Sequence, residues 1–192
     1  MSLIICCCLT AYASYAQDSL TATKKIHYTS QNYVGIVDGE YKPAFQLQTI
    51  HGVSYQTWFI GLGAGLDYYL LRSIPVFAAL NKDLRIKNRV FYVSGEIGTN
   101  FPWIKNGQLP VYGYSSGASN YSEGVYWSGG IGYKAFLKNR TDAILINLGY
   151  SHKRLKEVRE VGRMCIAPPC DPGYERYDYM MRRLSIRLGW QF

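Results

Sequence analysis

The sequence ends on Tyr179-Met-Met-Arg-Arg-Leu-Ser-Ile-Arg-Leu-Gly-Trp-Gln-Phe192, a stretch in which apolar and polar residues alternate. From Met180 onward every second residue is apolar, apart from Arg182, and the residues between them are almost all polar or small. A period of two residues places these sets on opposite faces of one extended strand. The stretch ends on an aromatic residue, and we expect no later residue to cover the apolar face. The stretch therefore predicts a strand with an apolar outer face.

The composition favours sheets and tight turns. The 192 residues correspond to one domain, and they include 18 Tyr, 19 Gly and 4 Trp. The mean hydropathy of −0.12 argues against a helical membrane protein. It is compatible with a membrane barrel, in which only alternate residues face lipid.

The formal net charge is +8, but the basic residues are spread over predicted turns and one long loop. Nucleic-acid binding needs them gathered on one face, so we expect no nucleic-acid partner. Attraction to anionic lipid headgroups is the use that this distribution favours.

Residues 1–16 are typical of a secretory signal peptide. An apolar run from Leu3 leads to Ser14-Tyr15-Ala16, with small residues at the two positions that signal peptidase reads. The alternative is a buried first helix, and the missing basic n-region leaves the true start of the signal open. We expect residues 17–31 to be a periplasmic lead-in and residues 32–192 to form the folded domain.

Eight stretches with strand character follow. They are residues 32–38, 44–53, 56–67, 74–80, 89–99, 124–136, 142–152 and 179–192. The links after the second, fourth and sixth strands are short, whereas those after the fifth and seventh are long. Short periplasmic turns and long external loops are typical of outer-membrane barrels. The sequence predicts an all-β, eight-stranded antiparallel up-and-down transmembrane β-barrel.

The stretch 56–67 carries three glycines on the face opposite its bulky residues: Gly61, Gly63 and Gly65. We expect these glycines to face inward and to leave room for large side chains from neighbouring strands. A membrane helix over residues 58–80 is excluded by Asp67, Arg72 and Pro75.

Eight strands enclose a lumen that side chains fill, so no diffusion pore is expected. The residues predicted to face inward include four charged side chains, namely Glu96, Lys134, Arg183 and Arg187, with Asp67 near one rim. Such a network could conduct protons or ions. The interpretation that we favour is a structural salt-bridge plug, because buried charges need partners.

An enzyme that edits lipid A is the alternative that the histidines raise. His152 follows Ser151 at the expected outer end of a strand. Adjacent strand residues point to opposite faces, so these two cannot form a Ser–His pair. We therefore expect no catalytic residues, no cofactor and no metal site.

Cys165 and Cys170 enclose Ile-Ala-Pro-Pro in a loop predicted to be external. Export places them in an oxidising compartment, which favours a disulfide. A metal site would need further ligands nearby, and none is present.

The same loop carries the basic residues Lys153, Arg154, Lys156 and Arg159. They are candidates for contacts with lipopolysaccharide phosphates at the outer rim. An ordinary solvated charged loop is the other interpretation, and both stay open.

Residues 61–69 (Gly-Leu-Gly-Ala-Gly-Leu-Asp-Tyr-Tyr), the segment Arg72-Ser-Ile-Pro75 and the final Trp190-Gln-Phe192 resemble small outer-membrane β-barrel proteins of Gram-negative bacteria, the OmpA/OmpX-like group. The resemblance implies location in the bacterial outer membrane. It also implies that Trp190 and Phe192 act as the signal to the barrel assembly machinery. We expect no peptidoglycan-binding domain after the barrel, which would distinguish the chain from OmpA.

The predicted function is that of a non-enzymatic, monomeric outer-membrane protein. Its partners would be outer-membrane lipid and lipopolysaccharide, and its external loops would serve surface interaction or envelope integrity. A lipid-A-modifying enzyme and a narrow ion channel are the alternatives.

Overall fold

The computed structural model describes residues 26–103, 119–137, 141–161 and 173–192. Within them it places nine strands: β1 (His27–Gly39), β2 (Ala44–Tyr55), β3 (Trp58–Asp67), β4 (Ser73–Ile86), β5 (Arg89–Pro102), β6 (Ser119–Ser122), β7 (Gly124–Phe136), β8 (Ala143–Val161) and β9 (Gly173–Gln191). None of the described residues forms a helix long and apolar enough to span a membrane.

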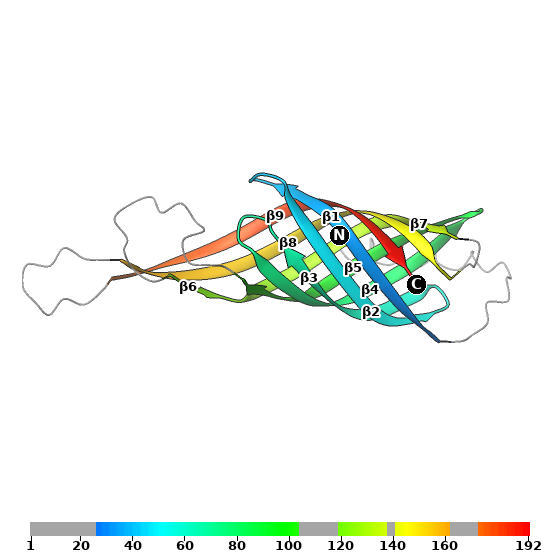
Figure 1. Cartoon of the computed structure of the whole chain (residues 1–192), viewed down its shortest axis with the longest axis horizontal. Helices are drawn as coiled ribbons and strands as arrows, with labels where there is room; N and C mark the ends of the chain where they lie inside the picture. Colours follow the sequence, from blue (N-terminus) through cyan, green and yellow to red (C-terminus); the bar gives the residue numbers. More distant parts are fainter. Residues whose placement is uncertain (1–25, 104–118, 138–140, 162–172) are drawn as a thin grey trace, which may run out of the picture.

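Eight of these strands close into a cylinder (Figure 1). Antiparallel pairing runs from β1 through β5, continues through β7 and β8, and reaches β9. Strand β9 then pairs with β1, from Gln31↔Gln191 to Gly39↔Arg183, so that the sheet has no open seam. The predicted eight-stranded antiparallel barrel is confirmed.

The strands are staggered around the barrel. We start at Trp58 on β3 and step to the cross-strand partner on each successive strand around the barrel, which leads to Phe45 on β2. The carbonyl of Phe45 accepts a hydrogen bond from Tyr68 N. Tyr68 lies ten residues beyond Trp58 in the same chain segment. A stagger of this order accompanies strands tilted by roughly 35–45°, and an eight-stranded barrel of this kind has an interior that side chains fill.

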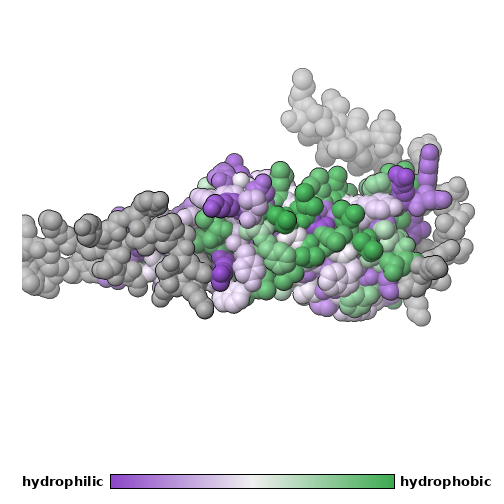
Figure 2. Space-filling model, turned by 45° about the horizontal axis from the view of Figure 1, so that its top comes forward, coloured by the Kyte–Doolittle hydropathy of each residue, from purple (hydrophilic) through white to green (hydrophobic). Residues whose placement is uncertain are grey.

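Side chains alternate between the lumen and the outer surface. On β9, Arg183 and Arg187 are buried, whereas Ile186 is 65% exposed. Figure 2 shows apolar side chains gathered over the middle of the barrel, with hydrophilic ones towards its ends. The outer surface thus carries an apolar belt.

Outward aromatic side chains edge this belt. We call the end with Phe192 and the short turns the terminal end, and the opposite end, beyond which β8 and β9 continue, the hairpin end. Exposed aromatics near the terminal end include Tyr55, Trp58, Phe91 and Trp190, and those near the hairpin end include Phe45, Tyr68, Phe101 and Trp127.

Inward glycines accommodate the large lumenal side chains. A Cβ on Gly63 would lie 2.7 Å from the ring of Phe77, and one on Gly189 would lie 2.5 Å from the ring of Tyr33. The prediction that the glycines of β3 leave room for large inward side chains is therefore confirmed at Gly63.

Two predicted boundaries were wrong. Strand β1 begins at His27, so residues 27–31 belong to the barrel and not to a lead-in. Strand β4 extends to Ile86, which reduces the predicted turn 81–88 to Lys87 and Asn88. Polar residues suggested a turn there, but Asn81 faces the lumen, where a polar side chain finds hydrogen-bond partners.

The predicted loop 153–176 was also wrong, because most of it is strand. Pairing of β8 with β9 continues from Lys153↔Met181 to Val161↔Gly173. Strand β6 pairs with the same part of β8, from Ser122↔Lys156 to Ser119↔Arg159. Figure 1 shows these strands projecting beyond the barrel. We call β6 together with residues 154–161 and 173–182 the hairpin sheet.

A β-bulge joins the barrel to the hairpin sheet. Tyr126 pairs with Lys153 and Ser122 with Lys156, so that the three residues between Ser122 and Tyr126 oppose the two between Lys153 and Lys156 on β8. Bulges bend the strand that carries them and are common at barrel rims. The bulge therefore allows β6 and β7, which follow one another in the chain, to pair with one continuous strand, β8.

Candidate functional sites in the lumen and the hairpin sheet

Arg187 lies at the centre of the lumen. Its Nη1 donates hydrogen bonds to Glu96 Oε1 at 2.7 Å and to Gln48 Oε1, and its Nε and Nη2 donate to Asn147 Oδ1 at 3.1 and 2.8 Å. The guanidinium also stacks over the ring of Tyr33 at 5.3 Å. These five side chains come from five strands, so the network connects opposite walls of the barrel.

A second ion pair lies near the terminal end. Lys134 Nζ is 2.8 Å from Asp83 Oδ1 and donates a hydrogen bond to Gln191 Oε1 at 3.2 Å. The ammonium lies 5.3 Å from the centre of the Tyr92 ring. Asp83 is one fifth exposed, so this pair lies where the lumen opens.

A third cluster lies near the hairpin end. Asp67 accepts a hydrogen bond from Arg183, and Lys153 Nζ lies 3.4 Å from the same carboxylate. Lys153 also donates to the carbonyls of Tyr69 and Leu71, at 3.0 and 2.9 Å. All three charged side chains are fully buried, and the two cations share one carboxylate.

An apolar cluster covers this end of the lumen. Its members come from three strands and from the link between β3 and β4: Val37, Tyr69, Leu71, Leu155 and Met181. The lumen is thus crossed by ion pairs at three levels and capped by hydrophobic packing.

The four charges predicted to face inward, Glu96, Lys134, Arg183 and Arg187, are all buried in the lumen. They take part in three separate ion pairs, because Lys134 pairs with Asp83 and not with Glu96. Sequence reasoning missed Asp83, which was assigned to a turn. It also missed Lys153 as a lumenal residue, although its position two residues after Ser151 continues the inward alternation.

Ser151 and His152 point to opposite faces, as their alternation predicts. Ser151 is buried in the lumen, whereas the ring of His152 stacks outside on Trp127, with ring centroids 5.8 Å apart. Within the described part of the chain, no three His, Cys, Asp or Glu side chains are grouped so as to hold a metal ion.

Glu157 is the central polar residue of the hairpin sheet. Its buried carboxylate accepts hydrogen bonds from Tyr179 Oη at 2.7 Å and from Arg159 Nε and Nη2 at 3.1 and 3.0 Å. Burial favours a higher pKa of Glu157, but hydrogen bonds from Tyr179, Ser119 and Arg159 outweigh it and lower the pKa. Glu157 thereby connects β6, β8 and β9.

Besides the pair of Glu157 with Arg159, the hairpin sheet has an ion pair on its exposed surface. Arg154 Nε donates to both carboxylate oxygens of Asp178, at 2.8 and 3.0 Å. These hydrogen bonds lower the pKa of Asp178. Both side chains are about 40% exposed.

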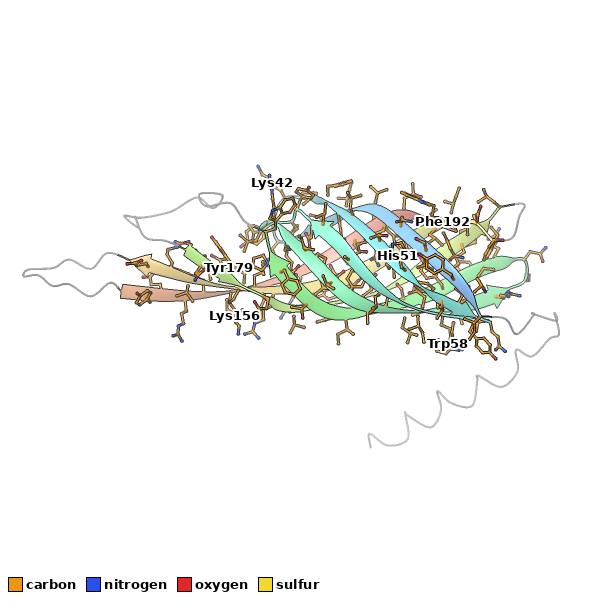
Figure 3. The ribbon with its side chains drawn as sticks, turned by 60° about the horizontal axis from the view of Figure 1, so that its bottom comes forward. Lys42, His51, Trp58, Lys156, Tyr179 and Phe192 are labelled. Carbon is orange, nitrogen blue, oxygen red and sulfur yellow. The ribbon has the colours of Figure 1, made fainter. Side chains whose placement is uncertain are left out.

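The lipopolysaccharide-contact candidates have different positions. Lys153 is buried in the lumen, so its inclusion was wrong. Arg154 and Arg159 pair with carboxylates of the hairpin sheet, and Lys156 is exposed. Figure 3 shows Lys156 and Tyr179 beyond the barrel, at the end opposite Trp58.

Trp190 and Phe192 lie outward at the seam, each about half exposed. Phe192 N donates to Ser30 O at 3.0 Å, and Ser30 N donates to Phe192 O at 2.8 Å. The predicted signal peptide 1–16 and the predicted disulfide between Cys165 and Cys170 lie outside the described residues.

No protein-family model and no curated protein matches the chain. Among solved structures, the chain is similar to Neisserial surface protein A (NspA), with 12% sequence identity and a TM-score of 0.47. The alignment covers 86% of this chain and 95% of that chain. A similarity of this size adds no argument about function, and the barrel fold is shown by the closed strand register itself.

Proposed function

We propose that the barrel spans the bacterial outer membrane, with the terminal end in the periplasm and the hairpin sheet outside the cell. The apolar belt and its two aromatic edges support this location. The turns at the terminal end are short, with only Gln56 and Thr57 between β2 and β3 and only Lys87 and Asn88 between β4 and β5. Short turns are typical of the periplasmic side.

The protein acts in this proposal as a non-enzymatic, monomeric surface protein, and the hairpin sheet is its interacting part. One observation carries this function: the lumen is closed by buried ion pairs, while β6, β8 and β9 project beyond it. The β9 edge from Gly173 to Arg182 has no partner strand among the described residues other than β8. Surface interaction or envelope integrity therefore falls to the hairpin sheet.

Lipopolysaccharide is the proposed partner at the rim. Arg182 is exposed on the outer surface beside His152, and Lys156 is exposed on the hairpin sheet. Such cations attract phosphate groups. The combined change Arg182→Gln and Lys156→Gln should weaken binding of the purified protein to lipopolysaccharide, whereas Lys87→Gln at the opposite end should leave it unchanged. Equal binding by all three proteins would remove lipopolysaccharide as partner.

The orientation can be tested by labelling intact cells with a membrane-impermeant maleimide. Single cysteines are introduced as Lys156→Cys and Asn88→Cys in a chain whose Cys165 and Cys170 are changed to Ser. We expect reaction at position 156 only, and reaction at position 88 after the outer membrane is permeabilised. Reaction at position 88 alone in intact cells would invert the proposed orientation. A changed lipid A mass spectrum on removal of the gene would favour an enzyme, and conductance in a planar bilayer would favour a channel.

A further inference from the structure

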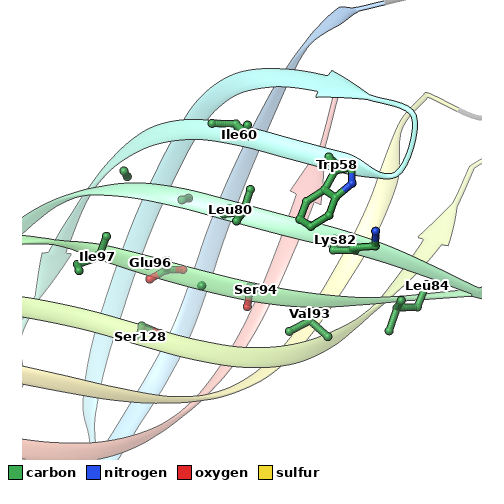
Figure 4. Close-up of a pocket in the computed structure, with 13 residues that line it drawn as sticks. Trp58, Ile60, Leu80, Lys82, Leu84, Val93, Ser94, Glu96, Ile97 and Ser128 are labelled. Atoms are coloured by element: carbon green, nitrogen blue, oxygen red, sulfur yellow. The ribbon is translucent and has the colours of Figure 1, made fainter. Parts of the chain in front are cut away.

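An apolar groove with a volume of about 760 Å³ lies on the outer surface of β3, β4 and β5 (Figure 4). The outward side chains that border it include Trp58, Ile60, Leu80, Lys82 and Val93. Its floor is formed by the strand backbone around Gly95. The groove therefore belongs to the apolar belt and not to the lumen.

An outward glycine, Gly95, lines the hollow, and a second, Gly129, lies beside it on β7. Gly95 and Gly129 are direct cross-strand partners. The nearest atom to a Cβ on Gly95 would be Leu80 O at 4.0 Å, and the nearest to a Cβ on Gly129 would be Ser94 O at 3.9 Å. Both positions therefore have room for a side chain, unlike the inward Gly63 and Gly189. One reason for a strand glycine, besides a bulge or a bend, is the close approach of a ligand.

The end of the groove nearest the short turns is positively charged. Figure 4 shows Lys82 beside Trp58, and Lys82 Nζ lies 4.0 Å from the centre of that ring. Among the described residues Lys82 has no carboxylate within ion-pair distance. The adjoining turn between β4 and β5 adds the exposed cation Lys87. This end of the groove is suited to an anionic group.

We propose that the groove binds one phospholipid with an anionic headgroup from the periplasmic leaflet. An acyl chain lies over Gly95 and Gly129, and the phosphate is bound by Lys82 at the level of Trp58. Lysine and tryptophan are the side chains that combine an apolar contact with a polar end at a membrane interface. The excess positive charge at this end favours a lipid over a second copy of the chain, which would bring the same cations together. The inference rests on the membrane orientation proposed above.

Native mass spectrometry of the whole protein, released from nanodiscs, tests the site. The nanodiscs contain equal amounts of phosphatidylglycerol and phosphatidylcholine with identical acyl chains. Gly95→Leu fills the hollow, Gly129→Leu adds bulk beside it, and Lys82→Gln removes the cation. Val125→Phe adds bulk to the outer surface of β7 away from the groove and is the matched control.

The wild-type protein should retain one phosphatidylglycerol in preference to phosphatidylcholine. Either glycine change should reduce lipid retention by about tenfold, corresponding to about two buried methylene groups. Lys82→Gln should reduce the headgroup preference by about fivefold, and Val125→Phe should match the wild type. Equal retention of both lipids by the wild type, or equal effects of Gly95→Leu and Val125→Phe, would overturn the proposal.

Two further outcomes separate the possible failures. A dimer that Gly95→Leu dissociates would assign the groove to a second copy of the chain and overturn the lipid site. A protein that folds without detergent and does not enter nanodiscs would refute the membrane location itself. A protein that enters nanodiscs and retains no preferred lipid would overturn the groove alone.

Discussion

The change Glu96→Gln should destabilise the barrel by about 3–5 kcal/mol, the cost of leaving one member of a buried ion pair without its partner. The Glu96 and Arg187 side chains are each only 3% exposed. The Glu96 carboxylate also accepts a hydrogen bond from Tyr126 Oη at 2.9 Å. Glutamine preserves the size of the side chain, so the loss of stability measures the cost of leaving the Arg187 guanidinium unpaired and not the cost of a cavity.

The free energy of unfolding can be measured by urea titration in detergent, followed by tryptophan fluorescence and by heat-modifiable migration on gels. Asp178→Asn is the matched control, because it breaks the exposed pair with Arg154, which solvent screens. We expect no measurable change for the control. The double change Glu96→Gln and Arg187→Gln should recover part of the loss, since it removes the unpaired buried charge. A loss below about 1 kcal/mol for Glu96→Gln alone would refute the structural role of this pair, since exposed pairs already reach that value.

Four further results are expected. Phe192→Ala should impair assembly in cells more than it shifts the unfolding midpoint, because the backbone hydrogen bonds to β1 do not need its ring; equal assembly would contradict this. Glu157 has a lowered pKa in the folded state, so its stabilisation is complete above its unfolded pKa of about 4.3 and is lost as the pH falls through the lower folded value. The protection of the backbone amides of the hairpin sheet against hydrogen exchange, relative to their intrinsic exchange rates, should fall there, and Glu157→Gln should remove this pH dependence. Cys165 and Cys170 should resist thiol labelling until the protein is reduced. Lys87→Gly should raise stability by about 0.5–1 kcal/mol, because Lys87 has a φ of 54°, and urea unfolding would show it.

The sequence was sufficient to predict the barrel because the alternation of its strands encodes which face each residue occupies. The inward positions of Glu96 and Arg187 follow from that alternation alone. Their pairing does not, because it depends on the stagger that brings β5 and β9 to the same level across the lumen. The partner of Lys134 was missed for a related reason: Asp83 lies in a polar stretch that local composition assigns to a turn.

The hairpin sheet was missed because polarity alone does not distinguish a loop from a strand that has solvent on both faces. Beyond the barrel no apolar face is required, so charged residues such as Lys156 and Glu160 occur within β8. The only remaining signal was the spacing of the buried Leu155 and Glu157, which continues the inward alternation of the barrel. Two residues are too few to predict a strand.

Arg182, which interrupts the apolar series at the end of the sequence, marks the edge of the belt. Its cross-strand partner is His152, and the outward residues of β8 also change from apolar to polar at this position, after Tyr150. The inward series continues past the same level, with Lys153 buried in the lumen. The outward residues therefore define where the apolar belt ends, whereas the inward residues define how far the barrel is packed. These two limits differ on the same strands, so that β8 and β9 remain packed on their lumenal side beyond the level at which their outer faces stop being apolar.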